Sequence, residues 1–266
     1  MTGVAVTTQI DHIVIEAGDE EALFSLFTER LGLPIAWPMA QWGFIHEGGA
    51  LVGNTNLGCN HPLDPNSDPA PTVRAVALDP AAALADVVDM VRTRGFDATT
   101  PMPSGVIDVP DNEPFTPWRG GWTNVLVLDA STDPVPFLCE YDHDRQARRN
   151  AERARLDAAG GGPLGVTGLD AVVVHADDAD HAAASWRRLL EPVTEPSPGR
   201  LQLGAGPALE LRAGATPALV FRVKSLAAAA RALTERGIAH DRNGEHELQL
   251  DGRDVLGLDL QLVERV

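Results

Sequence analysis

Alternating apolar and polar positions recur at four places along the chain, and each is joined to a short amphipathic helix pattern. Strand-like runs at residues 10–17 and 169–176 both precede a helix that opens with acidic residues. Two further runs, 73–78 and 218–223, lead into helices that end at an Arg-Gly pair, with the glycines at Gly95 and Gly237. Several short strand-like runs follow each helix. The pattern therefore predicts four βαβββ units in the order A, B, A, B, in which one A-B pair has been duplicated.

Two domains of two units each follow from this repeat. We expect a first domain over residues 1–145, a linker over 146–164 and a second domain over 165–266. Residues 145–159 are rich in charge and predict a solvated helix, and the glycines at 160–162 predict a flexible joint. The first domain is longer, chiefly because a proline-rich loop at 103–121 is inserted. This loop is either a binding loop or a surface elaboration.

Composition excludes several classes of protein. The 266 residues carry 21 Lys and Arg against 38 Asp and Glu, a formal net charge of −17, which disfavours nucleic acid and anionic membranes as partners. We expect no transmembrane segment and no secretory signal. Two cysteines, Cys59 and Cys139, do not make a disulfide framework, and both are out of register with the expected pocket positions. We therefore expect a cytosolic protein whose thiols are structural.

Four motifs stand out in the first two predicted units: Asp-His-Ile-Val-Ile at 11–15, the helix end at 27–34, Gly-Asn-Thr-Asn-Leu at 53–57 and Pro-Phe-Leu-Cys-Glu-Tyr at 136–141. They resemble the modules of the vicinal oxygen chelate superfamily, which includes glyoxalase I, bleomycin-resistance proteins and extradiol dioxygenases. The resemblance implies an α+β fold in which four βαβββ modules pair into two glyoxalase-like domains. Each domain would have a curved mixed sheet and outer helices, with the strands of two modules forming a cup.

In this family the metal ligands come from the first and last strands of each module. The resemblance therefore implies that His12 and Glu140 are catalytic metal ligands, for a divalent ion such as Fe, Mn, Zn or Ni. Gly58 stands at the usual glutamate position, and Ala171 replaces the histidine of the second domain. His12 could instead be a satisfied pocket residue, and Glu140 could pair with an arginine. We expect the degenerate second domain to stabilise the first or to form a dimer surface.

Two classes of function remain open for the N-terminal cup. The first is a metal-dependent lyase, isomerase or dioxygenase that chelates a small oxygenated substrate. The second is a metal-free protein of the bleomycin-resistance type, which would sequester an aromatic or cationic compound. For either class we expect substrate contacts from Trp42, His46, Asn56 and Trp122, and His46 or Asn56 could supply a third metal ligand. Metal analysis would discriminate the two.

Overall fold

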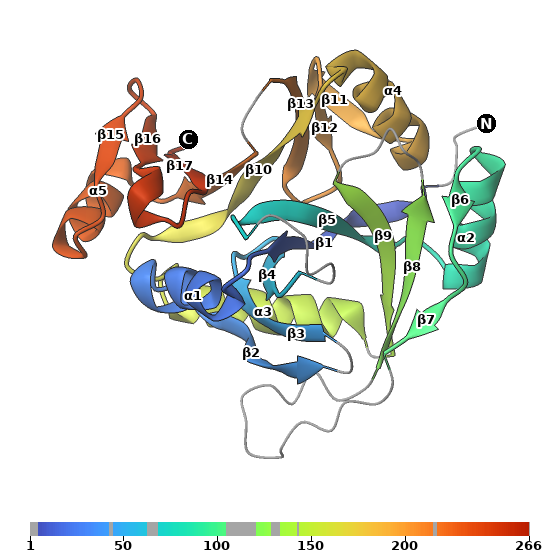
Figure 1. Ribbon diagram of the computed structural model, residues 1–266, viewed down its shortest axis with the longest axis horizontal. Coiled ribbons are helices and arrows are strands. Elements are labelled where there is room, and N and C mark those ends of the chain that lie inside the picture. Colours follow the sequence, from blue (N-terminus) through green and yellow to red (C-terminus); the bar gives the residue numbers. More distant parts are fainter. Residues whose placement is uncertain are drawn as a thin grey trace.

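The computed structural model describes residues 5–42, 45–62, 69–104, 121–128, 134–142, 144–214 and 217–265. Its elements follow one another as four strand-helix-strand modules, which confirms the predicted α+β class (Figure 1). Within these residues, no helix is both long and apolar enough to cross a membrane.

The first two modules form one curved mixed sheet. Its strands run β2 (Ile35–Trp42), β3 (Ile45–Leu51), β4 (Asn56–Asn60), β1 (Thr7–Glu16), β5 (Thr72–Pro80), β9 (Val135–Tyr141), β8 (Trp122–Leu128) and β6 (Asp97–Ala98), and β7 (Met102–Pro103) pairs with β8. The first strands of the two modules, β1 and β5, pair antiparallel at the centre, and each also pairs in parallel with its module's last strand. The two modules therefore meet in the middle of one cup.

The last two modules repeat this arrangement. The order is β11 (Thr194–Ser197), β12 (Arg200–Gln202), β13 (Ala208–Ala213), β10 (Val166–Ala176), β14 (Ala218–Val223), β17 (Asp259–Val263), β16 (Glu247–Leu250) and β15 (His240–Arg242). Again the first strands, β10 and β14, pair antiparallel at the centre. The two sheets therefore share one strand order.

Each module contributes one helix whose apolar stripe is buried. The helices are α1 (Glu20–Ser25), which continues as a π-helical turn (Leu26–Arg30), α2 (Leu84–Thr93), α4 (Ala179–Leu190) and α5 (Leu226–Glu235). Both α2 and α5 begin at a leucine whose backbone N–H donates to a glutamate, Glu140 for Leu84 and Glu264 for Leu226. A carboxylate suits the positive end of a helix dipole, so the two pairs start these helices in the same way. A short 3-10 turn (Gly252–Asp254) precedes β17.

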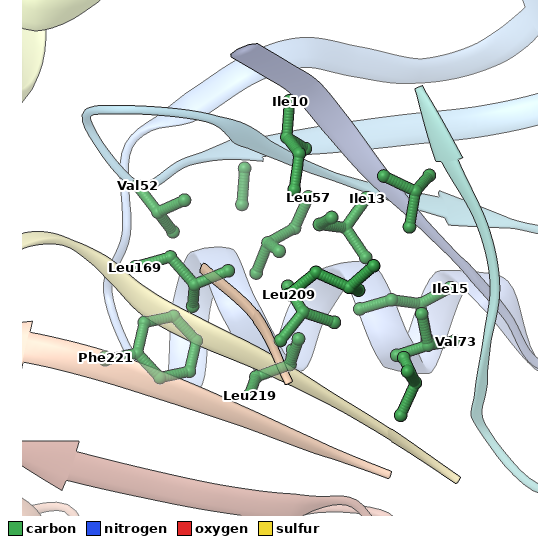
Figure 2. Close-up of a cluster of buried hydrophobic side chains, with 14 of the residues drawn as sticks. Ile10, Ile13, Ile15, Val52, Leu57, Val73, Leu169, Leu209, Leu219 and Phe221 are labelled. Atoms are coloured by element: carbon green, nitrogen blue, oxygen red, sulfur yellow. The ribbon is translucent and has the colours of Figure 1, made fainter. Parts of the chain in front are cut away.

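The two sheets pack against each other through one shared hydrophobic core. Ile10, Ile13 and Ile15 of β1 lie in the same cluster as Leu209 of β13 and Leu219 of β14 (Figure 2). Because side chains alternate along a strand, the residues between them point the other way. Val14 of β1 and Ala171 of β10 accordingly belong to two separate clusters, one on the opposite face of each sheet. The two cups therefore face away from each other.

Helix α3 (Arg145–Ala158) departs from the expected solvated helix. Arg148, Glu152 and Leu156 are all buried, and they recur every four residues along one side of the helix. This side packs into the N-terminal cup, where Arg148 binds Asp11 of β1 and Glu152 accepts from Asn56 of β4. The prediction of a solvated helix was wrong because a stripe of one cation, one anion and one leucine resembles an exposed helix face. The residues that pair with this stripe lie far away in the sequence.

Candidate functional site in the N-terminal cup

A cavity of about 270 Å³ opens in the part of the N-terminal cup that α3 leaves free. Strands of both modules supply its walls. The apolar lining comes mainly from Val14, Trp37, Ile45, Met102, Trp122, Leu126 and Phe137, and the polar lining from His12, Glu16, Glu47, Asn60, His61, Arg74, Asn124 and Tyr141, with Cys139 beside them. Such an apolar pocket with a few polar groups is typical of a small-molecule site.

Trp37 forms one wall because two glycines make room for its indole. A Cβ at Gly49 would lie 2.5 Å from the Trp37 ring, and one at Gly58 would lie 3.5 Å from it. The indole therefore covers Gly58, the position at which the resemblance implies a metal-binding glutamate. Trp37 is 6% exposed and makes an edge contact with His12, with 6.0 Å between ring centroids. An aromatic side chain here fills space that a ligand carboxylate would need.

His12 lies on the cavity wall and is held in place by its neighbour in the sequence. Its Nδ1 lies 2.8 Å from Asp11 Oδ2, and the Phe137 ring packs edge-on at 5.5 Å. A register shift between Ile10 and His12 in the β1–β5 pairing turns both adjacent side chains toward the cup. An ionised carboxylate can only accept hydrogen bonds, so Nδ1 of a neutral His12 carries the proton and Nε2 is left as an acceptor.

Asp11 is the centre of a buried ion network that sequence reasoning missed. It is 1% exposed, and its carboxylate accepts from Arg148, from Arg149 at 2.9 Å and from Tyr141 Oη at 2.7 Å. Burial raises the pKa of the Asp11 carboxyl, but the charge of Arg148 and the His12 hydrogen bond outweigh it, so that the pKa lies well below its usual value. The available signal was an acidic residue within an apolar strand, together with an arginine-rich helix elsewhere.

The structure does not bring Glu140 to His12. Glu140 Oε1 accepts from Leu84 N at the start of α2, which lies on the face of β9 away from the cup. Its neighbours Cys139 and Tyr141 line the cavity instead. This corrects the predicted faces of Glu140 and Cys139, because the register of β9 differs by one residue from the expected one, and such a shift exchanges the two faces of a strand.

The other predicted contacts divide between the cavity and its surroundings. Trp122 lines the cavity, as expected of a binding residue. His46 instead points to Glu20, with 2.8 Å between Nδ1 and Oε1, and Asn56 lies under α3, where its amide donates to Glu152 at 3.2 Å. The side chain of Trp42 lies outside the described residues, as does Trp118.

The donor set of the cup does not fit a divalent metal ion. Among the residues that the structure describes, no three His, Cys, Asp or Glu side chains gather into a metal-holding group. Of the strand positions that the resemblance assigns to ligands, β1 offers His12, while Gly58 of β4 carries no ligand atom and β5 presents Ala75. Burial raises the pKa of the Cys139 thiol on β9 far above its usual value, which disfavours the thiolate that would bind a metal.

Comparisons with known proteins agree with this fold. A family model described as a glyoxalase-like domain matches residues 60–190. A 2,3-dioxygenase, LapB, from Pseudomonas sp. KL28 superimposes with a TM-score of 0.61 at 11% identity, covering 99% of this chain and 94% of that chain. The Mn(II)-bound glyoxalase from Novosphingobium aromaticivorans gives 0.61 at 12% identity, over 98% and 83% of the two chains. Homoprotocatechuate 2,3-dioxygenase from Brevibacterium fuscum, in complex with 3,4-dihydroxyphenylacetate, gives 0.64 at 13% identity, over 100% and 83%.

A comparison with the curated proteins finds no match. The family model and the fold together agree with the resemblance drawn from the motifs: residues 60–190 match a glyoxalase-like domain, and the fold is that of the dioxygenases and the glyoxalase above. At 11–13% identity the likeness to the solved structures establishes the fold alone. One fold hosts many chemistries, so the chemistry of the cup depends on its own residues.

Proposed function

We propose that the N-terminal cup binds a small, largely apolar aromatic molecule directly, without a metal ion between protein and ligand. The observation that carries this proposal is the cavity of about 270 Å³, whose walls are mainly aromatic and aliphatic. Among the described residues, no three His, Cys, Asp or Glu side chains gather there into a group that could hold a metal ion. The Trp37, Trp122 and Phe137 rings favour a flat guest. A structural neighbour holds 3,4-dihydroxyphenylacetate, which is also aromatic.

His12 would orient such a ligand. Its Nε2 acceptor suits a hydroxyl or N–H group of the guest, and Asp11 fixes the ring through Nδ1. The geometry resembles a preorganised binding site, in which the polar group of the protein does not have to rearrange when the ligand arrives.

A metal-dependent enzyme is the second candidate. It is favoured by His12, which keeps the first-strand position, and by the Mn(II)-bound glyoxalase among the structural neighbours. The two candidates differ in metal content. Elemental analysis of the purified protein should find well under one divalent ion per chain if the cup works without metal, and about one ion, lost in His12→Ala, if it is a metal centre.

Direct binding is tested by titrating the protein with small aromatic compounds while following tryptophan fluorescence and heat. We expect saturable binding that a Phe137→Ala substitution weakens roughly tenfold or more, because a large part of the apolar wall is lost. Leu256→Ala is the matched control, since Leu256 is 41% exposed and belongs to the C-terminal pair. Equal affinities in the two variants, or no binding at all, would place the function elsewhere.

A further inference from the structure

One residue that lines the cavity has a buried polar atom without a hydrogen-bond partner among the described residues. Asn60, at the end of β4, is 7% exposed and lies opposite Glu47 of β3 in the strand register. The Asn60 side chain hydrogen-bonds to the Glu47 carboxylate. Burial raises the pKa of the Glu47 carboxyl, whereas the Asn60 hydrogen bond favours its ionised form. An ionised carboxylate only accepts, so in that form the amide nitrogen faces Glu47 and the carbonyl Oδ1 faces away. That Oδ1 is buried and has no hydrogen-bond partner in the part of the chain that the structure describes.

A second unpaired acceptor lies on the other half of the same cavity. Asn124 of β8 belongs to the second module, and its Oδ1 is also buried without a partner within the described ranges. The polar lining therefore offers two amide oxygens, the Glu47 carboxylate and His12 Nε2, all of which accept hydrogen bonds. Among the described lining residues, Arg74 carries a guanidinium, which is exposed and faces Glu16 at 3.7 Å.

Buried acceptors without a partner are costly, and a ligand that donates to them removes the cost. A protonated primary amine has three N–H donors, and its charge complements Glu47. Its cation would also be attracted by the faces of aromatic rings in the wall. A carboxylate in the same place would bring one acceptor against another and a negative charge against Glu47.

We propose that this cavity selects ligands whose polar group donates hydrogen bonds, and that a primary amine on an apolar body is held with its N–H groups at Asn60 and Glu47. The inference rests on the proposed function, because it assigns the polar end of the ligand that the cup binds. It also states which ligands the cup prefers, since it distinguishes amines from acids of the same shape.

The test is isothermal titration of the whole protein with three probes that share one ring: phenethylamine, 2-phenylethanol and phenylacetate. We expect the amine to bind tightest, the alcohol less tightly and the acid weakest, with roughly ten- to hundredfold between amine and acid. If all three bind equally, or if phenylacetate binds best through Arg74, this inference is overturned and the proposed function stands. If none of the three binds, both are overturned.

Two substitutions assign the preference to the residues named. Asn60→Leu removes the acceptor at similar volume, and Glu47→Gln removes the charge, so each should reduce the ratio of amine to acid affinity by about tenfold. Asn243→Leu is the control, because Asn243 is exposed between β15 and β16 of the C-terminal pair. An unchanged ratio in both cavity variants, with circular dichroism like that of the parent protein, contradicts the assignment even where the ligand still binds.

Discussion

At the scale of single residues, the two cups carry an aspartate that binds arginines at equivalent strand positions. Asp11 and Asp170 each lie near the middle of a central strand and bind arginines, Arg148 and Arg149 in one case, and Arg200 and Arg265 in the other. In the first cup His12 follows the aspartate, whereas in the second Ala171 does. The second cup therefore lacks the imidazole that follows the aspartate in the first cup, which is why we expect it to be degenerate. It still keeps a buried carboxylate that is held by arginines.

Asp170 makes stability depend on pH. Burial raises the pKa of its carboxyl, but hydrogen bonds from Arg265 and Arg200 and their charges outweigh it, so the pKa lies below the usual 3.8. A carboxyl with a lowered folded-state pKa stabilises the protein above its unfolded-state pKa, and this contribution is lost as the pH falls through the folded-state value. We expect Asp170→Asn to lower the free energy of unfolding at pH 6 and the difference from the parent protein to shrink below about pH 4.

Urea unfolding at a series of pH values measures this difference. Asp241→Asn is a suitable control, because Asp241 is exposed on β15. A difference that stays constant from pH 6 to pH 2.5 would show that the ion pairs of Asp170 do not carry its contribution.

At the scale of elements, α3 decides the shape of the site. The helix covers one part of the N-terminal cup and leaves the cavity in the other part. Leu156 is its buried leucine, and the other buried positions, Arg148 and Glu152, are charged. The Arg148 guanidinium also stacks on the Tyr141 ring, 4.1 Å from its centroid. The docking of α3 thus depends on compensated charge, in which neither partner can be removed alone without leaving the other buried and unpaired.

We therefore expect Arg148→Met to destabilise the protein by about 3–5 kcal/mol, because Asp11 would keep a buried charge with less compensation. The double variant Asp11→Asn with Arg148→Met should lose less than the sum of the two single changes. Urea denaturation measures all three. Arg153→Met, on the exposed side of the same helix, should change stability by less than about 0.5 kcal/mol. Additive losses would mean that the pair does not couple α3 to the sheet.

At the scale of the whole molecule, the two module pairs share a core. Ile13 of β1 and Leu209 of β13 belong to the same buried cluster, so neither sheet is covered on this face without the other (Figure 2). Asn54 adds a polar link: its amide donates to Leu169 O at 3.0 Å and accepts from Leu169 N at 2.9 Å. The C-terminal pair therefore covers the face of the N-terminal sheet that lies opposite the cavity.

We expect a cavity-forming change in the C-terminal pair to weaken the N-terminal one. Leu209→Ala should destabilise the protein by about 2–5 kcal/mol and speed amide hydrogen exchange in β1 as well as in β10. Hydrogen exchange followed by mass spectrometry measures both strands. Leu256→Ala, at an exposed position, is the control. Faster exchange confined to β10–β17 would show that the two pairs unfold independently.

Most of the fold was determined by the sequence itself. The period of the apolar positions, the acidic helix starts and the glycines after the second helix of each pair are local signals, because each depends on the backbone within a few residues. They predicted four modules, their duplication and the strands on which His12 and Trp122 lie. The family resemblance of the motifs followed from the same local features and was confirmed.

Only the tertiary structure decided which side chains share the cup. The register of β9 differs by one residue from the expected one, so Cys139 and Tyr141 line the cup where Glu140 was expected. No local sequence pattern fixes the register of a strand to one residue. The burial of α3 depended on Asp11, which lies 137 positions away from Arg148 in the sequence. The sequence therefore determined the elements and their faces, whereas pairing across the sheet and compensation of charge over long distances determined the chemistry of the site.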